Sequence, residues 1–161
     1  MTPAQAVVAL GANLGDTRAA LDEAVRELRA LPLTSKVVCS TPIASVAVTL
    51  DGPDPSKPGY LNAVALVETR LAPSILLEAL HAIEERHGRV RRERWGDRTL
   101  DLDLIAYGDV TSDDPRLTLP HPRAHERDFV LAPWAEVDPD AILPGRGRVA
   151  RLRDELAAGA S

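Results

Sequence analysis

The chain has 161 residues, of which 45% are hydrophobic and 27% charged, and its formal net charge is −5. This length is enough for one domain with a hydrophobic core, and the composition is ordinary for a globular protein. The acidic net charge argues against binding long nucleic acids through the overall field, and no apolar run approaches the roughly 20 residues of a membrane helix. We therefore expect one domain over residues 1–161, monomeric, without a nucleic-acid or membrane partner.

The first half of the chain predicts a strand, a helix and two more strands. Residues 6–10 form an apolar run, and Asp16 is a good N-cap for the amphipathic helix that follows. Residues 36–40 and 60–67 are the next two strands. Between them, residues 41–59 contain four prolines and predict a long irregular segment.

The second half adds a helix and a strand. Pro73 suits the first position of a helix, and Gly88 suits its end. An arginine-rich loop follows, and residues 99–107 are the fourth strand. The element order is therefore βαββαβ, which predicts an α+β sandwich of the ferredoxin-like type, with two helices on one face of an antiparallel sheet.

Residues 120–161 predict a partly helical C-terminal appendage. A short helix is expected over residues 124–131, stopped by Pro133 because proline lacks the amide hydrogen that a helix interior uses. A second helix is expected over residues 149–158. The sequence shows no internal repeat or linker, so we expect the appendage to belong to the same domain.

Two aspartates in the fourth strand indicate a metal site. Side chains alternate along a strand, so Asp101 and Asp103 share one face, while Leu100, Leu102 and Leu104 share the other. Two parallel carboxylates repel each other unless a cation lies between them. Two Mg²⁺ ions about 3.5–4 Å apart match this spacing and can clamp a phosphoryl-transfer centre. For this pattern alone, a solvent-facing acidic strand is the alternative.

Arginines are concentrated just before this strand. Six of them fall within a short stretch: Arg86, Arg89, Arg91, Arg92, Arg94 and Arg98. Such a local cationic patch on an acidic protein fits a small phosphate-rich ligand, because the planar guanidinium makes bidentate phosphate contacts. His121 and Arg127 are interpreted as a further phosphate-contacting pair, since no Cys or His cluster completes a zinc site around His121 and His125.

Aromatic residues and the single cysteine give two further indications. Among only five aromatics, Tyr60, Trp95 and Phe129 lie inside polar or charged motifs, which suggests stacking on a flat ring. Cys39 cannot form an internal disulfide, and the N-terminus has no basic region before its first strand. Both observations predict a cytoplasmic protein.

In this order, these motifs resemble the 6-hydroxymethyl-7,8-dihydropterin pyrophosphokinase family of folate biosynthesis. The resemblance runs along essentially the whole chain, and its most specific part is the arginine–tryptophan–aspartate block at residues 94–105. The other matching segments are residues 9–16, 59–64, 88–91, 117–122 and 127–131. The resemblance implies that the enzyme transfers pyrophosphate from ATP to the pterin hydroxymethyl group and releases AMP.

The resemblance also implies roles for single residues. Asp101 and Asp103 would hold two Mg²⁺ ions, and they would form the catalytic set with Arg89 and Arg91. The residues implied to bind ATP are Glu84, Arg98, Thr118, His121 and Arg127, with Arg89 and Arg91 also on the phosphates. Those implied to hold the pterin are Ser45, Tyr60, Asn62, Trp95 and Phe129. Residue chemistry agrees, because an asparagine offers both a donor and an acceptor to the pterin edge.

Three segments depart from the family's pattern. Asp97 stands where the family has a small residue or proline, and the arginine loop is slightly shorter than usual. The loop before Tyr60 is longer and lacks the common Thr-Pro-Pro run. Either Thr41-Pro42 or Ser45-Val46 replaces that run, and we favour Ser45.

Two other functions fit parts of this pattern. One is a ferredoxin-like nucleotide- or RNA-binding module, although such modules use stacked aromatics where this chain has carboxylates on its fourth strand. The other is a different Mg²⁺-dependent phosphoryl or nucleotidyl transferase. The released nucleotide distinguishes a pyrophosphokinase from a simple kinase, because pyrophosphate transfer yields AMP and a simple kinase yields ADP.

Overall fold

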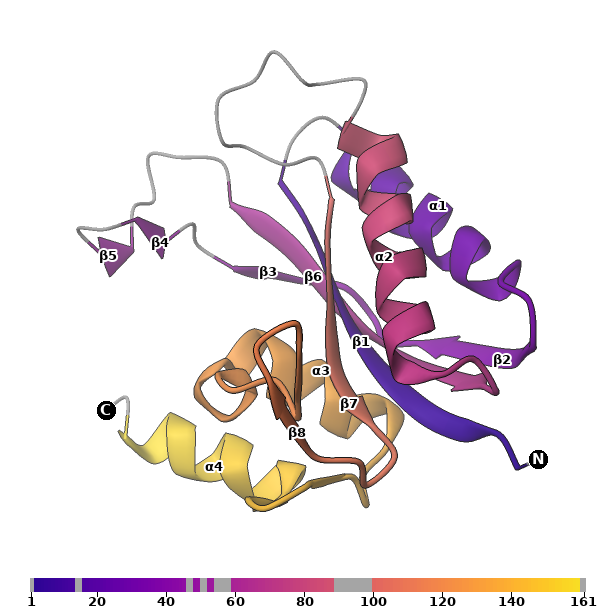
Figure 1. The fold of residues 1–161 in the computed structure, drawn as a ribbon. Helices are drawn as coiled ribbons and strands as arrows, with labels where there is room; N and C mark the ends of the chain where they lie inside the picture. The colour runs from indigo at the N-terminus through magenta and orange to yellow at the C-terminus, as the bar shows by residue number, and fades with distance from the viewer. Residues whose placement is uncertain are drawn as a thin grey trace.

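Figure 1 shows the protein as a computed structural model, which describes residues 2–13, 16–45, 59–88 and 100–159 and the backbone of 48–49 and 52–53. The main sheet contains β1 (Ala4–Ala12), β2 (Thr34–Cys39), β3 (Ile43–Ser45), β6 (Tyr60–Thr69) and β7 (Asp101–Tyr107). The helices are α1 (Thr17–Arg29), α2 (Pro73–Gly88), α3 (Asp128–Val137), α4 (Val149–Gly159) and the 3₁₀ turn η2 (Ala124–Glu126). Three short pairs complete the described segments: β4 (Val48–Thr49) with β5 (Gly52–Pro53), β8 (Ser112–Asp114) with β9 (Leu117–Leu119), and β10 (Ile142–Leu143) with β11 (Gly147–Arg148).

The sheet has the predicted ferredoxin-like arrangement. Its strand order is β2-β6-β1-β7, with every neighbouring pair antiparallel, and β3 pairs with β6. Helices α1 and α2 lie together on one face of the sheet (Figure 1). This confirms the α+β fold expected from the βαββαβ order. None of the helices in the described segments is long and apolar enough to span a bilayer.

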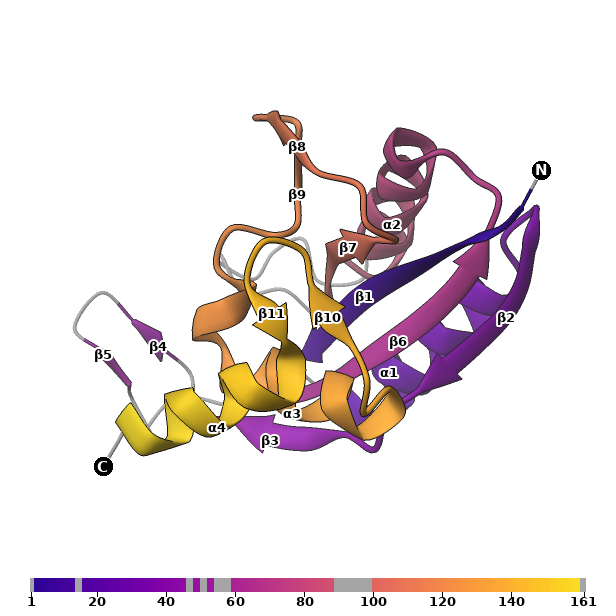
Figure 2. The ribbon, with the colours of Figure 1, turned by 90° about the horizontal axis from the view of Figure 1, so that it is seen from below.

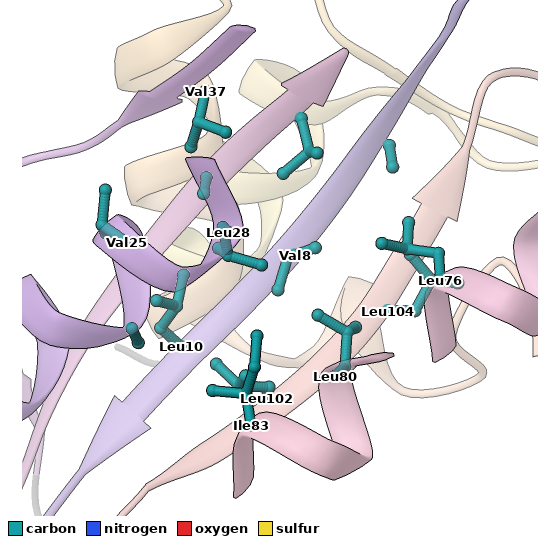
Figure 3. Packing of buried hydrophobic residues seen from close by; sticks show 14 of the residues in the cluster. Val8, Leu10, Val25, Leu28, Val37, Leu76, Leu80, Ile83, Leu102 and Leu104 are labelled. Carbon is teal, nitrogen blue, oxygen red and sulfur yellow. The ribbon is translucent and has the colours of Figure 1, made fainter. Parts of the chain in front are cut away.

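Local sequence explains why the two sheet-covering helices form where they do. The Asp16 carboxylate accepts a hydrogen bond from the Ala19 backbone amide at 3.0 Å, which caps α1 as predicted. Helix α2 begins at Pro73, whose missing amide hydrogen costs nothing in the first turn. Figure 3 shows the apolar faces of both helices packed against strand residues, with Leu80 and Ile83 of α2 near leucines of β7.

The opposite face of the sheet has a second hydrophobic cluster beneath α3 and α4. Val64 and Ile105 of the sheet are buried there against Leu131 and Trp134 of α3. Figure 2 shows α3 and α4 close together on this side, with β3 beside them. The two helices cover only part of this face, and the uncovered part carries the site described below.

Two predictions of local structure were wrong. The helix expected over residues 124–131 is split, because Arg127 is extended (φ −114°, ψ 102°) between η2 and α3, and α3 then contains Pro133 instead of ending before it. Burial of the helix around Pro133 offsets the lost hydrogen bond. The segment at 41–59, expected to be irregular, contributes β3, in which Ser45 lies opposite Tyr60 of β6.

Candidate active site

Strand register brings the predicted site residues onto one face of the sheet. Gly11 on β1 lies opposite Asn62 on one side and Asp101 on the other. Ala9 lies opposite Asp103 in the same way. Directly paired residues point to the same side of a sheet, as do residues two apart. Both aspartates and Asn62 therefore face away from α1 and α2, while the alternate leucines of β7 are buried beneath α2.

A cavity of about 470 Å³ opens on this face. Its size lies within the range of about 300–1,000 Å³ that is usual for small-molecule sites. It is lined by Ala9, Leu10, Gly11, Ser45, Tyr60, Asn62, Asp101, Asp103, Arg123, Arg127, Phe129 and Val130. Seven of these are residues that the sequence assigned to substrate, nucleotide or metal, and they come from β3, β6, β7 and the start of α3.

Small residues on β1 keep the cavity open. A Cβ atom at Gly11 would lie 3.3 Å from Asn62 Oδ1, which is a tight contact, and 3.6 Å from the Tyr60 ring, which is ordinary van der Waals contact. Asn62 is 5% exposed. Its Nδ2 donates to Ser45 Oγ at 2.7 Å and to the Ile43 carbonyl at 3.4 Å. These bonds fix the amide relative to β3 and direct its donors toward that strand.

Arg127 lies between the carboxylate of Asp103 and the ring of Phe129. Its Nη1 lies 3.7 Å from Asp103 Oδ2, and its guanidinium carbon lies 5.9 Å from the centre of the Phe129 ring. The side chains of Arg127 and Asp103 are 29% and 47% exposed, so this ion pair is open to solvent. A cation in this position can contact an anionic group that approaches the two aspartates.

His121 lies beside this charged end of the cavity. Its backbone amide donates to the Ile105 carbonyl at 2.8 Å, and its Nδ1 accepts the Arg123 amide at 3.2 Å. Partial burial lowers the pKa of His121. The negative charge of Asp103 raises this pKa, and the positive charges of Arg127 and Arg123 lower it. The neutral ring that results, with Nδ1 acting as an acceptor, carries its hydrogen on Nε2 and can donate it to a phosphate oxygen.

Three described residues assigned to the nucleotide, namely His121, Glu84 and Thr118, lie outside the cavity lining. The Glu84 carboxylate accepts the backbone amide of Leu102 at 2.7 Å and so ties α2 to β7. The Thr118 hydroxyl donates to the Asp114 carbonyl at 3.1 Å and closes the β8–β9 hairpin. Arg89, Arg91, Arg98 and Trp95 lie outside the described residues. Their predicted roles, like those of Glu84 and Thr118, stay predictions.

Sequence reasoning missed one charged residue of the lining, Arg123. It precedes η2 just as Arg127 follows it, so the two arginines flank one short turn. An arginine four residues before an assigned phosphate contact was the available signal.

Comparison with known proteins agrees with this geometry. The model of the 7,8-dihydro-6-hydroxymethylpterin-pyrophosphokinase family matches residues 7–139. The chain belongs to this family. A pyrophosphokinase of this kind from Synechocystis sp. is 43% identical over 143 residues, which is 89% of this chain and 71% of the relative. The Haemophilus influenzae enzyme is 40% identical over 152 residues, covering 94% of this chain and 92% of the relative.

Two solved structures with a similar fold belong to larger proteins. One HPPK-DHPS structure in complex with substrates has a TM-score of 0.75 at 11% identity, over 99% of this chain and 44% of that one. Wild-type HPPK-DHPS from Plasmodium falciparum has a TM-score of 0.71 at 12% identity, over 97% of this chain and 41% of that one. The chain thus spans less than half of these proteins, and at such identities the likeness shows the fold alone.

Family membership confirms the activity that the sequence resemblance implied. The chain is an ATP-dependent pyrophosphokinase, which transfers a pyrophosphoryl group to 6-hydroxymethyl-7,8-dihydropterin in folate biosynthesis. ATP is its co-substrate. The two rival interpretations, an RNA-binding module and a different phosphoryl transferase, do not agree with this family.

Proposed function

We propose that pyrophosphoryl transfer takes place in the cavity on the uncovered sheet face. The triphosphate lies at the end formed by Asp101, Asp103 and Arg127, and the pterin lies at the end formed by Asn62 and Phe129. The observation that carries this assignment is the convergence of two carboxylates, a guanidinium, a buried amide and an aromatic ring on one face. Each group has a matching partner in one of the two substrates.

The carboxylate pair fits Mg²⁺. Both aspartates supply hard oxygen ligands from the same strand face, beside the small residues Ala9 and Gly11. Mg²⁺ is commonly held by one or two carboxylates together with substrate phosphates and water, a donor set that this cavity can complete when ATP is bound. Two such ions, as the sequence suggested, would neutralise charge on the phosphate oxygens during transfer.

The protein's own residues then act by positioning and by charge. Release of AMP requires that the pterin hydroxymethyl oxygen forms a bond to the β-phosphorus while the bond from that phosphorus to the α–β bridging oxygen breaks. Arg127 would hold phosphate oxygens in line with the hydroxymethyl group, and Asn62 and Phe129 would hold the ring from which that group projects. Phosphoryl-type transfer of this kind needs no protein nucleophile.

Three further points of the interpretation remain proposals. We expect two metal ions per active site, a monomer in solution, and a cytoplasmic location because the reaction consumes ATP. Light scattering of the purified protein tests the second point, and magnesium titration of nucleotide binding tests the first.

Phe129→Ala is expected to weaken pterin binding much more than ATP binding. The ring lines the cavity as a flat apolar surface, and aromatic stacking contributes about 0.5–1.5 kcal/mol beyond burial. Calorimetric titration with 6-hydroxymethylpterin, and separately with Mg²⁺ and α,β-methylene-ATP, measures both affinities. Leu156→Ala is the matched control, because Leu156 packs against the same hydrophobic cluster without lining the cavity. Unchanged pterin affinity in folded Phe129→Ala would remove Phe129 from the pterin site.

A further inference from the structure

The turn between the β9 segment and α3 presents two arginines to one cavity. Arg123 precedes the 3₁₀ turn and Arg127 follows it, and both line the cavity. Within the turn, the Glu126 amide donates to the Arg123 carbonyl at 3.0 Å, and the Arg127 amide donates to the Ala124 carbonyl at 3.2 Å. Ala124 is fully buried in the second hydrophobic cluster. The turn is therefore anchored, and the spacing of its two arginines is set by the backbone.

The Arg123 side chain is held along one edge only. Its Nε donates to Glu126 Oε2 at 3.2 Å, which engages the Nε side of the planar guanidinium. Its backbone amide is bound to His121 Nδ1 at 3.2 Å. Among the residues that the structure describes, no acceptor is found for the Nη1 and Nη2 hydrogens of Arg123. These two groups form a fork whose geometry matches two oxygens of a phosphate.

The distribution of charge in the cavity distinguishes Arg123 from Arg127. The charged side chains of the described lining are Asp101, Asp103, Arg123 and Arg127. Arg127 already lies 3.7 Å from Asp103, so part of its charge is compensated within the cavity. Arg123 pairs instead with Glu126, which is not part of the described lining. Of the two arginines, Arg123 therefore combines two Nη groups without an acceptor among the described residues with an ion-pair partner that lies outside the lining.

We infer that Arg123 is a further ATP-binding residue, whose Nη fork contacts the phosphate chain at the rim of the cavity. Glu126 acts as a positioning residue that orients the guanidinium. The inference rests on the proposed function, which places the triphosphate at this end of the cavity.

Exposure separates the role of Arg123 from that of Arg127. The Arg123 side chain is 69% exposed, whereas that of Arg127 is 29% exposed. A hydrated contact on the rim stabilises bound ATP and the transition state by similar amounts, so its loss appears mainly in KM. A less exposed contact beside the aspartates stabilises the transition state more than it stabilises bound ATP, so its loss appears mainly in kcat.

The test measures affinity for α,β-methylene-ATP with Mg²⁺, affinity for 6-hydroxymethylpterin, and steady-state kinetics. Arg123→Gln should weaken binding of the ATP analogue about tenfold, the effect of losing one charge-assisted contact at a partly hydrated site. The KM for ATP should rise by a similar factor, with a much smaller fall in kcat and unchanged pterin affinity. The binding deficit should shrink as salt is raised, because exposed charges are screened.

Three further variants separate this role from a structural one. Arg123→Lys should recover part of the lost affinity because it keeps the charge, and Glu126→Gln should lose about threefold because the fork is less well oriented. Arg148→Gln is the control, since Arg148 is exposed and pairs with Asp140 away from the cavity. This variant removes the same charge and should leave analogue binding unchanged.

The inference is overturned if Arg123→Gln binds the analogue as tightly as the wild type does, or if Arg148→Gln loses as much affinity. Equal loss of pterin and analogue affinity in Arg123→Gln would also overturn it, because that pattern indicates damage to the fold. Failure of the proposed function looks different: Asp101→Asn and Asp103→Asn, at the centre of the cavity, would keep near-native turnover. The binding comparison among variants would still decide whether Arg123 contacts the nucleotide.

Discussion

Asp101→Asn and Asp103→Asn are each expected to lower turnover by about 100-fold or more, the scale of losing a charge preorganised for the transition state. Asparagine keeps the shape and one oxygen of the side chain but removes the negative charge that binds a divalent cation. Steady-state assays over a range of Mg²⁺ concentrations measure the effect. Nucleotide affinity should lose its magnesium dependence in parallel.

The stability of the metal-free variants is the control for this prediction. Without metal, the two parallel carboxylates repel each other across one strand face, and the exposed Arg127–Asp103 pair is worth about 0–1 kcal/mol, so each substitution should change the stability of the metal-free protein little. Thermal unfolding in EDTA measures this. Asp22→Asn is the matched variant, because Asp22 is an exposed carboxylate on α1, on the opposite face of the sheet. If either active-site variant keeps near-native turnover at limiting Mg²⁺, that aspartate is not a metal ligand.

Arg127→Gln is expected to lower kcat by about 100-fold, because a guanidinium fixed beside developing phosphate charge acts mainly in the transition state. Arg127→Lys should recover only part of this loss, since an ammonium group keeps the charge but not the planar fork. The KM for ATP should change less than kcat in both variants. A stopped assay with saturating pterin separates the two parameters.

Stability distinguishes this effect from unfolding. The ion pair with Asp103 is partly exposed and long, at 3.7 Å, and such pairs are worth about 0–1 kcal/mol. The melting temperature of Arg127→Gln should therefore stay close to that of the wild type. A variant with normal kcat and a lowered melting temperature would show that Arg127 supports the fold and not the reaction.

The sequence predicted the site well where a residue's position follows from strand alternation. Asp101 and Asp103 had to share a face once the intervening Leu102 was assigned to the core, and the structure places them so. The helix starts at Asp16 and Pro73 were equally predictable, because each depends on the hydrogen-bonding capacity of one residue.

The remaining features depend on contacts that sequence periodicity does not contain. Strand β3 is short and lies in a proline-rich segment, and it is defined by its pairing with β6. Pro133 stays inside α3 because tertiary burial outweighs its weak helix propensity. The bond between the Glu84 carboxylate and the Leu102 amide depends on how α2 is set against β7, and the predicted nucleotide role of Glu84 stays a prediction. Arg123 was missed because its position at the cavity depends on the 3₁₀ turn η2, which replaces the start of the helix expected over residues 124–131.

The most direct test of pyrophosphoryl transfer follows the label of ATP into products. The purified protein is incubated with Mg²⁺, 6-hydroxymethyl-7,8-dihydropterin and ATP labelled at either the α- or the γ-phosphate. The predicted result is that γ-label appears in the pterin product, α-label appears only in AMP, and AMP forms in equal amount to that product. Formation of ADP with a singly phosphorylated pterin, or release of AMP at the same rate without pterin, would contradict the assignment.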